Sequence, residues 1–192
     1  EEVKKDCWNT SLLIIDFNYK NIKFRKLFSN RKCIHSIKNE NKEFNSMQSG
    51  GRIIDLDSKN IAFTTGEFRF RSLAQDLNSI NGKVIKINTD TGKYDLISIG
   101  HRNPQGLLYD KEKEALLITE HGPAGGDEIN LISLKNTKKP LNYGWPISSY
   151  GNHYSDKLNL TRKIKYSFIK SHSSKGFVEP LKYYTPSIGP SE

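Results

Sequence analysis

The sequence has few of the segments that would mark a membrane-spanning or cysteine-rich protein. Its 192 residues include two cysteines and one methionine. No run of about 18 apolar residues occurs, so we expect no membrane span. The first residues lack the basic, apolar and small-residue pattern of a secretory signal. Both ends look like cuts through a larger protein, and the length suffices for one domain with a hydrophobic core.

Common catalytic and nucleic-acid-binding signatures are also missing. The glycine-rich residues 122–126 are not followed by Gly-Lys-Ser/Thr, so they do not form a phosphate-binding loop. No nucleophile elbow and no zinc-binding His-Glu-x-x-His occurs. The net charge is +9, but the basic residues are scattered as on a solvated surface. We therefore expect no nucleic-acid partner, although the charge suits a small anionic ligand.

The two cysteines flank one expected hairpin. Cys7 precedes and Cys33 follows the apolar runs at residues 11–17 and 24–28, which a polar turn joins. A hairpin would bring its ends together, so a disulfide is favoured over two free buried thiols. A disulfide would indicate an oxidising compartment.

Short apolar runs separated by turn residues predict an all-β protein. The runs are rich in Ile, Leu, Val, Phe and Tyr, and only residues 73–80 have the character of a helical turn. Strands are expected at residues 11–17, 52–56, 61–65, 83–88, 94–99, 106–109, 115–120 and 128–134.

An internal repeat indicates how these strands are arranged. The runs at 51–56 and 61–65 resemble those at 106–110 and 115–119, with an offset of 54 residues from Thr65 to Thr119. This offset is close to the roughly 50-residue blade of some propellers. We therefore predict a β-propeller of four-stranded antiparallel blades, three to four of them, as one partial domain over residues 1–192 truncated at both ends. A β-sandwich is the alternative, and it would need no repeat.

Two successive loops carry groups that suit charged ligands. In residues 100–106, Arg102 offers a planar fork of donors that suits carboxylates, and Asn103 and Gln105 can each donate and accept. Residues 120–130 offer backbone carbonyls and the carboxylates Asp127 and Glu128, which are hard oxygen ligands of the kind calcium takes. One loop therefore suits an anion and the next a cation.

These loops occur in order with three further motifs. The motifs are AQDLNSINGKVIKIN at residues 74–88, NYGWP at 142–146 and YTPSI at 184–188. Over residues 50–191 the sequence resembles the glucose/sorbosone dehydrogenase family, which includes soluble quinoprotein glucose dehydrogenases and aldose sugar dehydrogenases. The resemblance implies a six-bladed β-propeller that binds pyrroloquinoline quinone (PQQ) and calcium and oxidises sugars at the anomeric carbon.

The resemblance also implies the residues that bind PQQ. Arg102 and Asn103 would contact the cofactor, with Gln105 close by and Tyr154 against it. The charge of Arg102 matches a ligand with three carboxylates. The alternatives are a salt bridge for Arg102 and a core or rim position for Tyr154. His101 belongs to the same motif, and we expect it to support the loop.

The implied calcium ligands are Glu128 and the backbone of Tyr143, with carbonyls of Gly122 and Pro123. The alternative is a turn in which carboxylates bind backbone N–H groups. Residues 134–141 look like an inserted loop that could change the spacing to Tyr143. Trp145 is expected to pack rather than react.

Gln48 is the main departure from the family pattern. Catalytic members have a histidine at this position, which takes the proton as hydride leaves the sugar for the quinone. A glutamine amide does not titrate near neutral pH, so it cannot be a general base. His121 and Glu67 lie in loops expected near the channel and are weak candidates for that role.

Two functions remain open from the sequence. The first is a PQQ-dependent sugar dehydrogenase of the periplasm or cell exterior, with a small-molecule sugar substrate and an unidentified electron acceptor. The second is a non-catalytic propeller that binds a carbohydrate or a protein partner. Gln48 favours the second function, and the cluster of Arg102, Asn103 and Gln105 favours the first.

Overall fold

The computed structural model describes residues 2–17, 20, 22–30, 32–38, 43–135, 138–153 and 168–191. Within these ranges the regular structure is almost entirely β-strand, with two short 3-10 helices, η1 (Arg71–Ala74) and η2 (Ser173–Lys175). Among the described residues no helix has the length and apolarity needed to cross a membrane.

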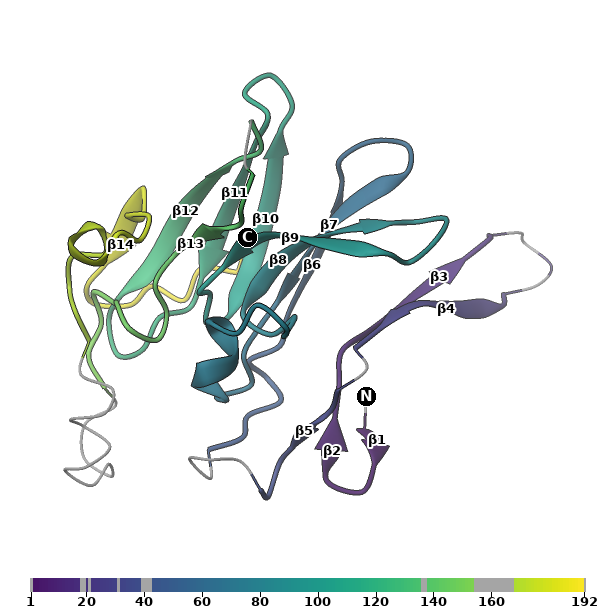
Figure 1. Ribbon diagram of the computed structural model, residues 1–192, viewed down its shortest axis with the longest axis horizontal. Coiled ribbons are helices and arrows are strands. Elements are labelled where there is room, and N and C mark those ends of the chain that lie inside the picture. Colours follow the sequence, from purple (N-terminus) through teal and green to yellow (C-terminus); the bar gives the residue numbers. More distant parts are fainter. Residues whose placement is uncertain are drawn as a thin grey trace.

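Two antiparallel sheets lie side by side and form the body of the molecule (Figure 1). We call the first sheet blade A. Its strands are β6 (Gly50–Asp55), β7 (Asn60–Thr65), β8 (Lys83–Asn88) and β9 (Tyr94–Ile99), with β13 (Leu141–Asn142) added parallel to β9. The second sheet, blade B, has the order β10 (Pro104–Asp110), β11 (Ala115–Glu120), β12 (Asp127–Ser133) and β14 (Lys182–Tyr184).

The N-terminal part forms two smaller sheets. A hairpin pairs β3 (Ser11–Ile15) with β4 (Phe24–Ser29), and a three-stranded sheet joins β1 (Glu2–Lys4), β2 (Cys7–Trp8) and β5 (Ile34–His35). The hairpin lies on the side of blade A that faces away from blade B (Figure 1).

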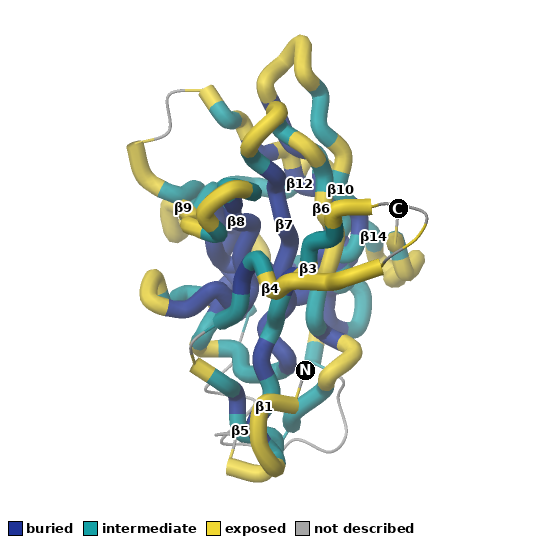
Figure 2. Tube along the Cα trace, turned by 90° about the vertical axis from the view of Figure 1, so that its right-hand side faces the viewer, coloured by how far each residue is buried: buried dark blue, intermediate teal, exposed yellow. Residues whose placement is uncertain are grey.

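Successive side chains of β7 point to opposite faces of the sheet and pack on different neighbours, which explains why the sheets stack. Ile61 and Phe63 pack on the β3–β4 hairpin, whereas Ala62 packs with Leu116 and Ile118 of blade B. Both faces of β7 are therefore buried, as Figure 2 shows by its dark tube. Face-to-face stacking of twisted antiparallel sheets is the arrangement of propeller blades.

The predicted repeat corresponds to the first two strands of each blade. The segment at 51–65 covers β7 and all but the first residue of β6, and that at 106–119 covers most of β10 and β11 with the turn between them. The predicted all-β fold with four-stranded antiparallel blades is confirmed. The described residues contain two such blades and a two-stranded hairpin packed on the first. The helical turn expected at 73–80 lies slightly earlier, as η1.

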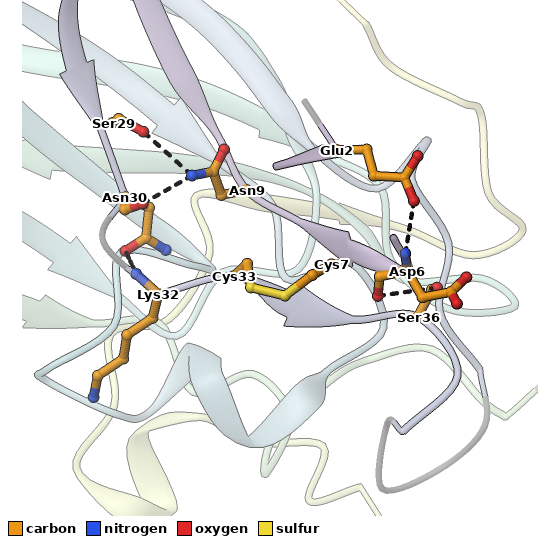
Figure 3. Close-up of a disulfide and its surroundings, with 9 residues drawn as sticks. All are labelled: Glu2, Asp6, Cys7, Asn9, Ser29, Asn30, Lys32, Cys33 and Ser36. Carbon is orange, nitrogen blue, oxygen red and sulfur yellow. Dashed lines mark hydrogen bonds between the residues drawn. A yellow bond between two sulfur atoms is a disulfide. The ribbon is translucent and has the colours of Figure 1, made fainter. Parts of the chain in front are cut away.

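The predicted disulfide between Cys7 and Cys33 is present, with 5.4 Å between the Cα atoms (Figure 3). It closes the base of the β3–β4 hairpin. Beside it, the Asn9 amide donates to the Asn30 carbonyl and the Ser29 hydroxyl. The disulfide therefore joins β2 to the residue that precedes β5, the two strands that flank the hairpin.

Candidate functional site

The candidate site lies where β7, β9 and β11 end and their loops meet. Within blade A, β7 and β9 run in the same direction, and the residues that follow β11 contact those that follow β9. An open cleft of about 290 Å³ lies at this end of the molecule. The cleft is lined by Asn45, Met47, Gln48, Arg102, Asn103, Gln105, His121, Gly122, Asp127, Ser187 and Gly189.

Arg102 forms part of the cleft wall and is nearly buried. One terminal nitrogen, Nη1, donates to the carbonyls of His121 at 2.8 Å and Gly122 at 2.7 Å. The guanidinium lies over the Trp145 ring, 5.4 Å from its centre. Arg102 thus contacts two carbonyls and an aromatic face in the cleft wall. Trp145 packs, as expected.

A buried hydrogen-bond network holds the Arg102 loop in place. The backbone N–H of Arg102 donates to Glu120 Oε2 at 2.8 Å. Glu120 Oε1 lies 2.9 Å from His101 Nδ1, and His101 Nε2 lies 2.7 Å from the Ser98 hydroxyl. Burial acts to raise the pKa of Glu120, but the His101 charge and these hydrogen bonds outweigh it and lower the pKa. His101 supports the loop, as expected.

Gln48 is held by charged neighbours on two sides. In the amide orientation that satisfies its neighbours, its nitrogen donates to Glu67 Oε1 at 3.0 Å. Its oxygen then accepts from Arg69 Nε at 3.1 Å and Arg102 Nη2 at 3.0 Å. Glu67 is fully buried, and this burial raises its pKa to about 7 against the lowering effect of Arg102 and Arg71. Of the two candidate bases, His121 lines the cleft and Glu67 lies behind Gln48.

Asn103 and Gln105 also reach the cleft. Asn103 Oδ1 accepts from the Gly50 N–H at 3.1 Å, which ties the start of β6 to the start of β10. The Gln105 carbonyl accepts from the Arg52 side chain. The structure therefore brings together three of the four residues predicted to bind the cofactor. The fourth, Tyr154, lies outside the described residues.

A second, small cavity of about 10 Å³ adjoins the cleft. It is lined by all four residues predicted to bind metal, and it shares Arg102, His121 and Gly122 with the cleft. Its lining residues are Gly100, Arg102, Glu120, His121, Gly122, Pro123, Gly126, Glu128, Tyr143, Trp145, Ser148 and Ser149.

The two neighbouring carboxylates of β12 differ in their partners. Asp127 accepts from the backbone N–H groups of Gly122, Ile188 and Gly189, so it stabilises turns. Glu128 instead accepts from the Asn130 side chain at 3.2 Å. Burial and the nearby negative charge of Glu120 raise the pKa of Glu128 well above its ordinary value. The alternative considered for these carboxylates, a turn held by hydrogen bonds from backbone N–H groups, therefore applies to Asp127. Glu128 accepts from a side chain instead.

Tyr143 reaches the small cavity despite the long loop before it. Its N–H donates to the Ile99 carbonyl and its hydroxyl donates to the Leu131 carbonyl at 2.6 Å. The parallel pairing of β13 with β9 places it there. The predicted change in spacing at 134–141 therefore does not separate Tyr143 from the cavity that Glu128 lines.

His172 is a residue of this region that sequence reasoning missed. It is 1% exposed, and its Nε2 lies 3.5 Å from Glu128 Oε1. Burial lowers the pKa of its imidazole. Its distance in sequence from Glu128 leaves no spacing motif that could have revealed the contact.

Comparisons with known proteins identify the family of this chain. The profile of the family described as Glucose / Sorbosone dehydrogenase matches residues 20–192. The aldose sugar dehydrogenase YliI of Escherichia coli is 38% identical over 153 residues, which cover 72% of this chain and 38% of that protein. Quinoprotein glucose dehydrogenase B of Acinetobacter calcoaceticus is 37% identical over 129 residues, covering 52% of this chain and 26% of that protein.

Solved structures show the same fold. The soluble aldose sugar dehydrogenase of Escherichia coli in its apo-form superposes with a TM-score of 0.62 at 28% identity, covering 85% of this chain and 45% of that one. A glucose dehydrogenase superposes with a TM-score of 0.72 at 25% identity, covering 98% and 52%. The chain thus spans about half of these solved structures and less of the curated relatives. It belongs to the glucose/sorbosone dehydrogenase family.

Proposed function

We propose that this chain is part of a PQQ-dependent aldose dehydrogenase, and that its two adjoining cavities hold the cofactor and a calcium ion. The main observation in support of this proposal is that the two cavities share part of their walls. Arg102, His121 and Gly122 line both the cleft and the small cavity. An anionic cofactor in the cleft would therefore lie next to a cation in the cavity, and each charge would stabilise the other.

The cleft residues fit an anionic, multi-carboxylate ligand. Arg102 supplies a charged donor that is shielded from water, where hydrogen bonds to carboxylates are strong. Asn103 and Gln105 add polar groups that can orient the ligand. When bound, PQQ would accept the hydride from the anomeric carbon of a sugar. The name of the Acinetobacter relative, a quinoprotein, supports this cofactor.

The small cavity fits a single cation. Its volume of about 10 Å³ is near the space that one water-sized sphere needs. Glu128 is a buried carboxylate with a raised pKa, which a cation would stabilise in its charged form. Carbonyls of Gly122, Pro123 and Tyr143 would complete an oxygen-rich set of the kind calcium takes. The Gly122 carbonyl also accepts from Arg102 Nη1.

Gln48 leaves the proton-transfer step without an evident base. Its amide cannot take the sugar proton. Glu67 has a suitable pKa of about 7, but it is fully buried behind Gln48. His121 lines the cleft and is the better placed of the two candidates. We therefore expect slow aldose oxidation by the wild-type protein.

Replacing Gln48 by histidine tests this assignment. In Gln48→His, an imidazole N–H could donate to Glu67, as the Gln48 amide does now. The free ring nitrogen would have an ordinary pKa near 6.5, which suits a general base. Turnover of aldoses by the full-length, PQQ-loaded protein with an artificial electron acceptor should rise, with little change in PQQ affinity. Brisk wild-type turnover that falls in Gln48→His would show that the base is assigned wrongly.

The second candidate function is a non-catalytic propeller that binds a carbohydrate or a protein through the same cleft. Gln48 is the observation that favours it, since binding needs no base. Failure of the full-length protein to bind PQQ, with and without calcium, would support this function over the first.

We also propose that the protein works in the periplasm or outside the cell. The disulfide between Cys7 and Cys33 supports this location, because disulfides persist in oxidising compartments and are rare in the cytosol.

A further inference from the structure

Two consecutive residues beside Gln48 have an unfavourable backbone conformation. Phe68 and Arg69 have φ angles of 55° and 62°, in the left-handed region that residues other than glycine rarely adopt. Such a conformation persists only where the surrounding structure holds it. We call residues 67–69 the left-handed turn. Its side chains hold Gln48, since Glu67 Oε1 accepts from the Gln48 nitrogen at 3.0 Å and Arg69 Nε donates to the Gln48 oxygen at 3.1 Å. The left-handed turn therefore sets the contacts of a residue that lines the cleft.

The segment that leads to Gln48 is joined to the left-handed turn along its length. The Phe68 N–H donates to the Gln48 carbonyl, and the Phe68 carbonyl accepts from the Asn45 N–H, both at 3.0 Å. Further back in this segment, Glu43 Oε2 lies 2.8 Å from Arg71 Nη2 in a mostly buried ion pair. The position of Gln48 consequently depends on how this segment and the turn fit together.

Three aromatic rings connect the left-handed turn to the N-terminal sheet. The buried Phe68 ring stacks on Phe44, with ring centres 5.9 Å apart and an angle of 6° between the planes. Phe44 also lies against Trp8 of β2, at 5.9 Å and 34°. Both distances are in the range of favourable aromatic pairs. Trp8 follows Cys7, whose disulfide joins β2 to the residue before β5 (Figure 3). The rings thus link a cross-linked sheet to the wall of the cleft.

We propose that Phe44 is a positioning residue for the cleft, because its stack on Phe68 holds the left-handed turn in place. Phe44 is not among the residues that line the cleft, so it acts through the turn whose side chains hold Gln48. The Gln48 oxygen in turn accepts from Arg102 Nη2 at 3.0 Å. A loosened turn would therefore also disturb the guanidinium that is proposed to bind PQQ, and this last step rests on the proposed function.

Hydrogen exchange of the full-length protein, measured by mass spectrometry, tests the proposal without the cofactor. In Phe44→Ala, peptides covering residues 45–48 and 66–70 should exchange about two- to tenfold faster than in the wild type, the factor that loss of one aromatic pair corresponds to. Peptides from β11 should exchange at the wild-type rate. Phe44→Leu keeps an apolar side chain without the stacked ring, and it should show the same local effect if Phe44→Ala does not fold.

Two further variants serve as comparisons for the exchange measurement. Phe44→Tyr keeps the ring and should exchange as the wild type does. Phe24→Ala removes an exposed ring on β4 and should leave residues 45–48 and 66–70 unchanged. Equal exchange of these residues in the wild type and in the Phe44→Ala and Phe44→Leu variants would overturn the proposal. A uniform rise that includes β11 would also overturn it, because it would show general destabilisation.

PQQ titration of the same variants separates this proposal from the proposed function. Where the wild type binds PQQ, Phe44→Ala should bind it more weakly and Phe44→Tyr should bind it as the wild type does. Unchanged PQQ affinity in Phe44→Ala would overturn the positioning role. Failure of the wild type to bind PQQ would contradict the proposed function alone, since the exchange result does not depend on the cofactor.

Discussion

Gln48 occupies the position where the proposed function would place a catalytic histidine, and its surroundings would suit either side chain. Its amide is held between Glu67 on one side and two arginines, Arg69 and Arg102, on the other. The carboxylate that would orient an imidazole at this position is therefore already present. If the proposed function is right, glutamine at this position lacks the proton acceptor but keeps the hydrogen-bonding partners.

The buried carboxyl of Glu67 should make stability depend on pH. Its pKa is about 7, against an ordinary value near 4.5. The folded state therefore binds more protons than the unfolded state between these pH values. Glu67 contributes stability that is fully present below pH 4.5 and is lost as pH rises through about 7, on the order of 3 kcal/mol.

Glu67→Gln should remove the decline in stability between pH 4.5 and 7. Urea unfolding at pH 4.5, 5.5, 7 and 8 should show the variant gaining stability relative to wild type as pH rises to 7, with no further gain above it. Glu112→Gln, on an exposed turn, is the control and should follow the wild type. If the free energy of unfolding changes with pH in the same way for the wild type and Glu67→Gln, the pKa of Glu67 is not raised.

Glu128 should control the response to calcium. An ion that binds only the folded state raises its stability by mass action. Glu128→Gln keeps the size of the side chain and removes its charge. The calcium-dependent rise in melting temperature should therefore shrink markedly in this variant, measured by calorimetry with calcium and with a chelator. Glu112→Gln should keep the full rise. An identical response of wild type and Glu128→Gln would place the site elsewhere.

The strands were largely predictable because their apolar residues recur in short runs between turns. β7, β8, β9 and β11 match the expected ranges within a residue. β13 and β14 were not predicted, because each consists of two or three residues that become strands only by pairing with β9 and β12. Such pairing depends on distant backbone and not on local pattern.

The N-terminal hairpin should depend on its disulfide. Cys7 and Cys33 are separated by 26 residues, and a bond across such a loop is worth about 3 kcal/mol. In full-length protein exported to an oxidising compartment, thiol labelling after unfolding without reductant should find neither cysteine reactive. Reduction should lower the melting temperature. Two labelled thiols per chain would contradict the disulfide and remove the support for an exported protein.

Most residues of the candidate site could be predicted from the sequence, but the contacts among them could not. The motifs around Arg102 and Glu128 identified most residues of the two cavities, because they are continuous in sequence. The contact of Gln48 with Arg102 and that of Glu128 with His172 join separate segments. Local sequence carries no signal for either contact, since each arises from the packing of one blade or segment against another.

As a whole, the molecule places an open cleft beside a small cavity where the loops of two blades meet. Arg102 lies in the wall between them. The proposed function thus requires that the same protein bind PQQ and that Arg102 carry much of the affinity. A charge-assisted hydrogen bond from its guanidinium is worth about 1.5–3 kcal/mol.

The most direct test is a spectroscopic titration of the full-length protein with PQQ in the presence of calcium. We predict saturable binding by the wild type and by Arg25→Ala, an arginine exposed on the β4 strand. Arg102→Ala should lose the cofactor while circular dichroism shows that it remains folded. No saturable PQQ binding by the wild type, or equal binding by Arg102→Ala, would contradict the account.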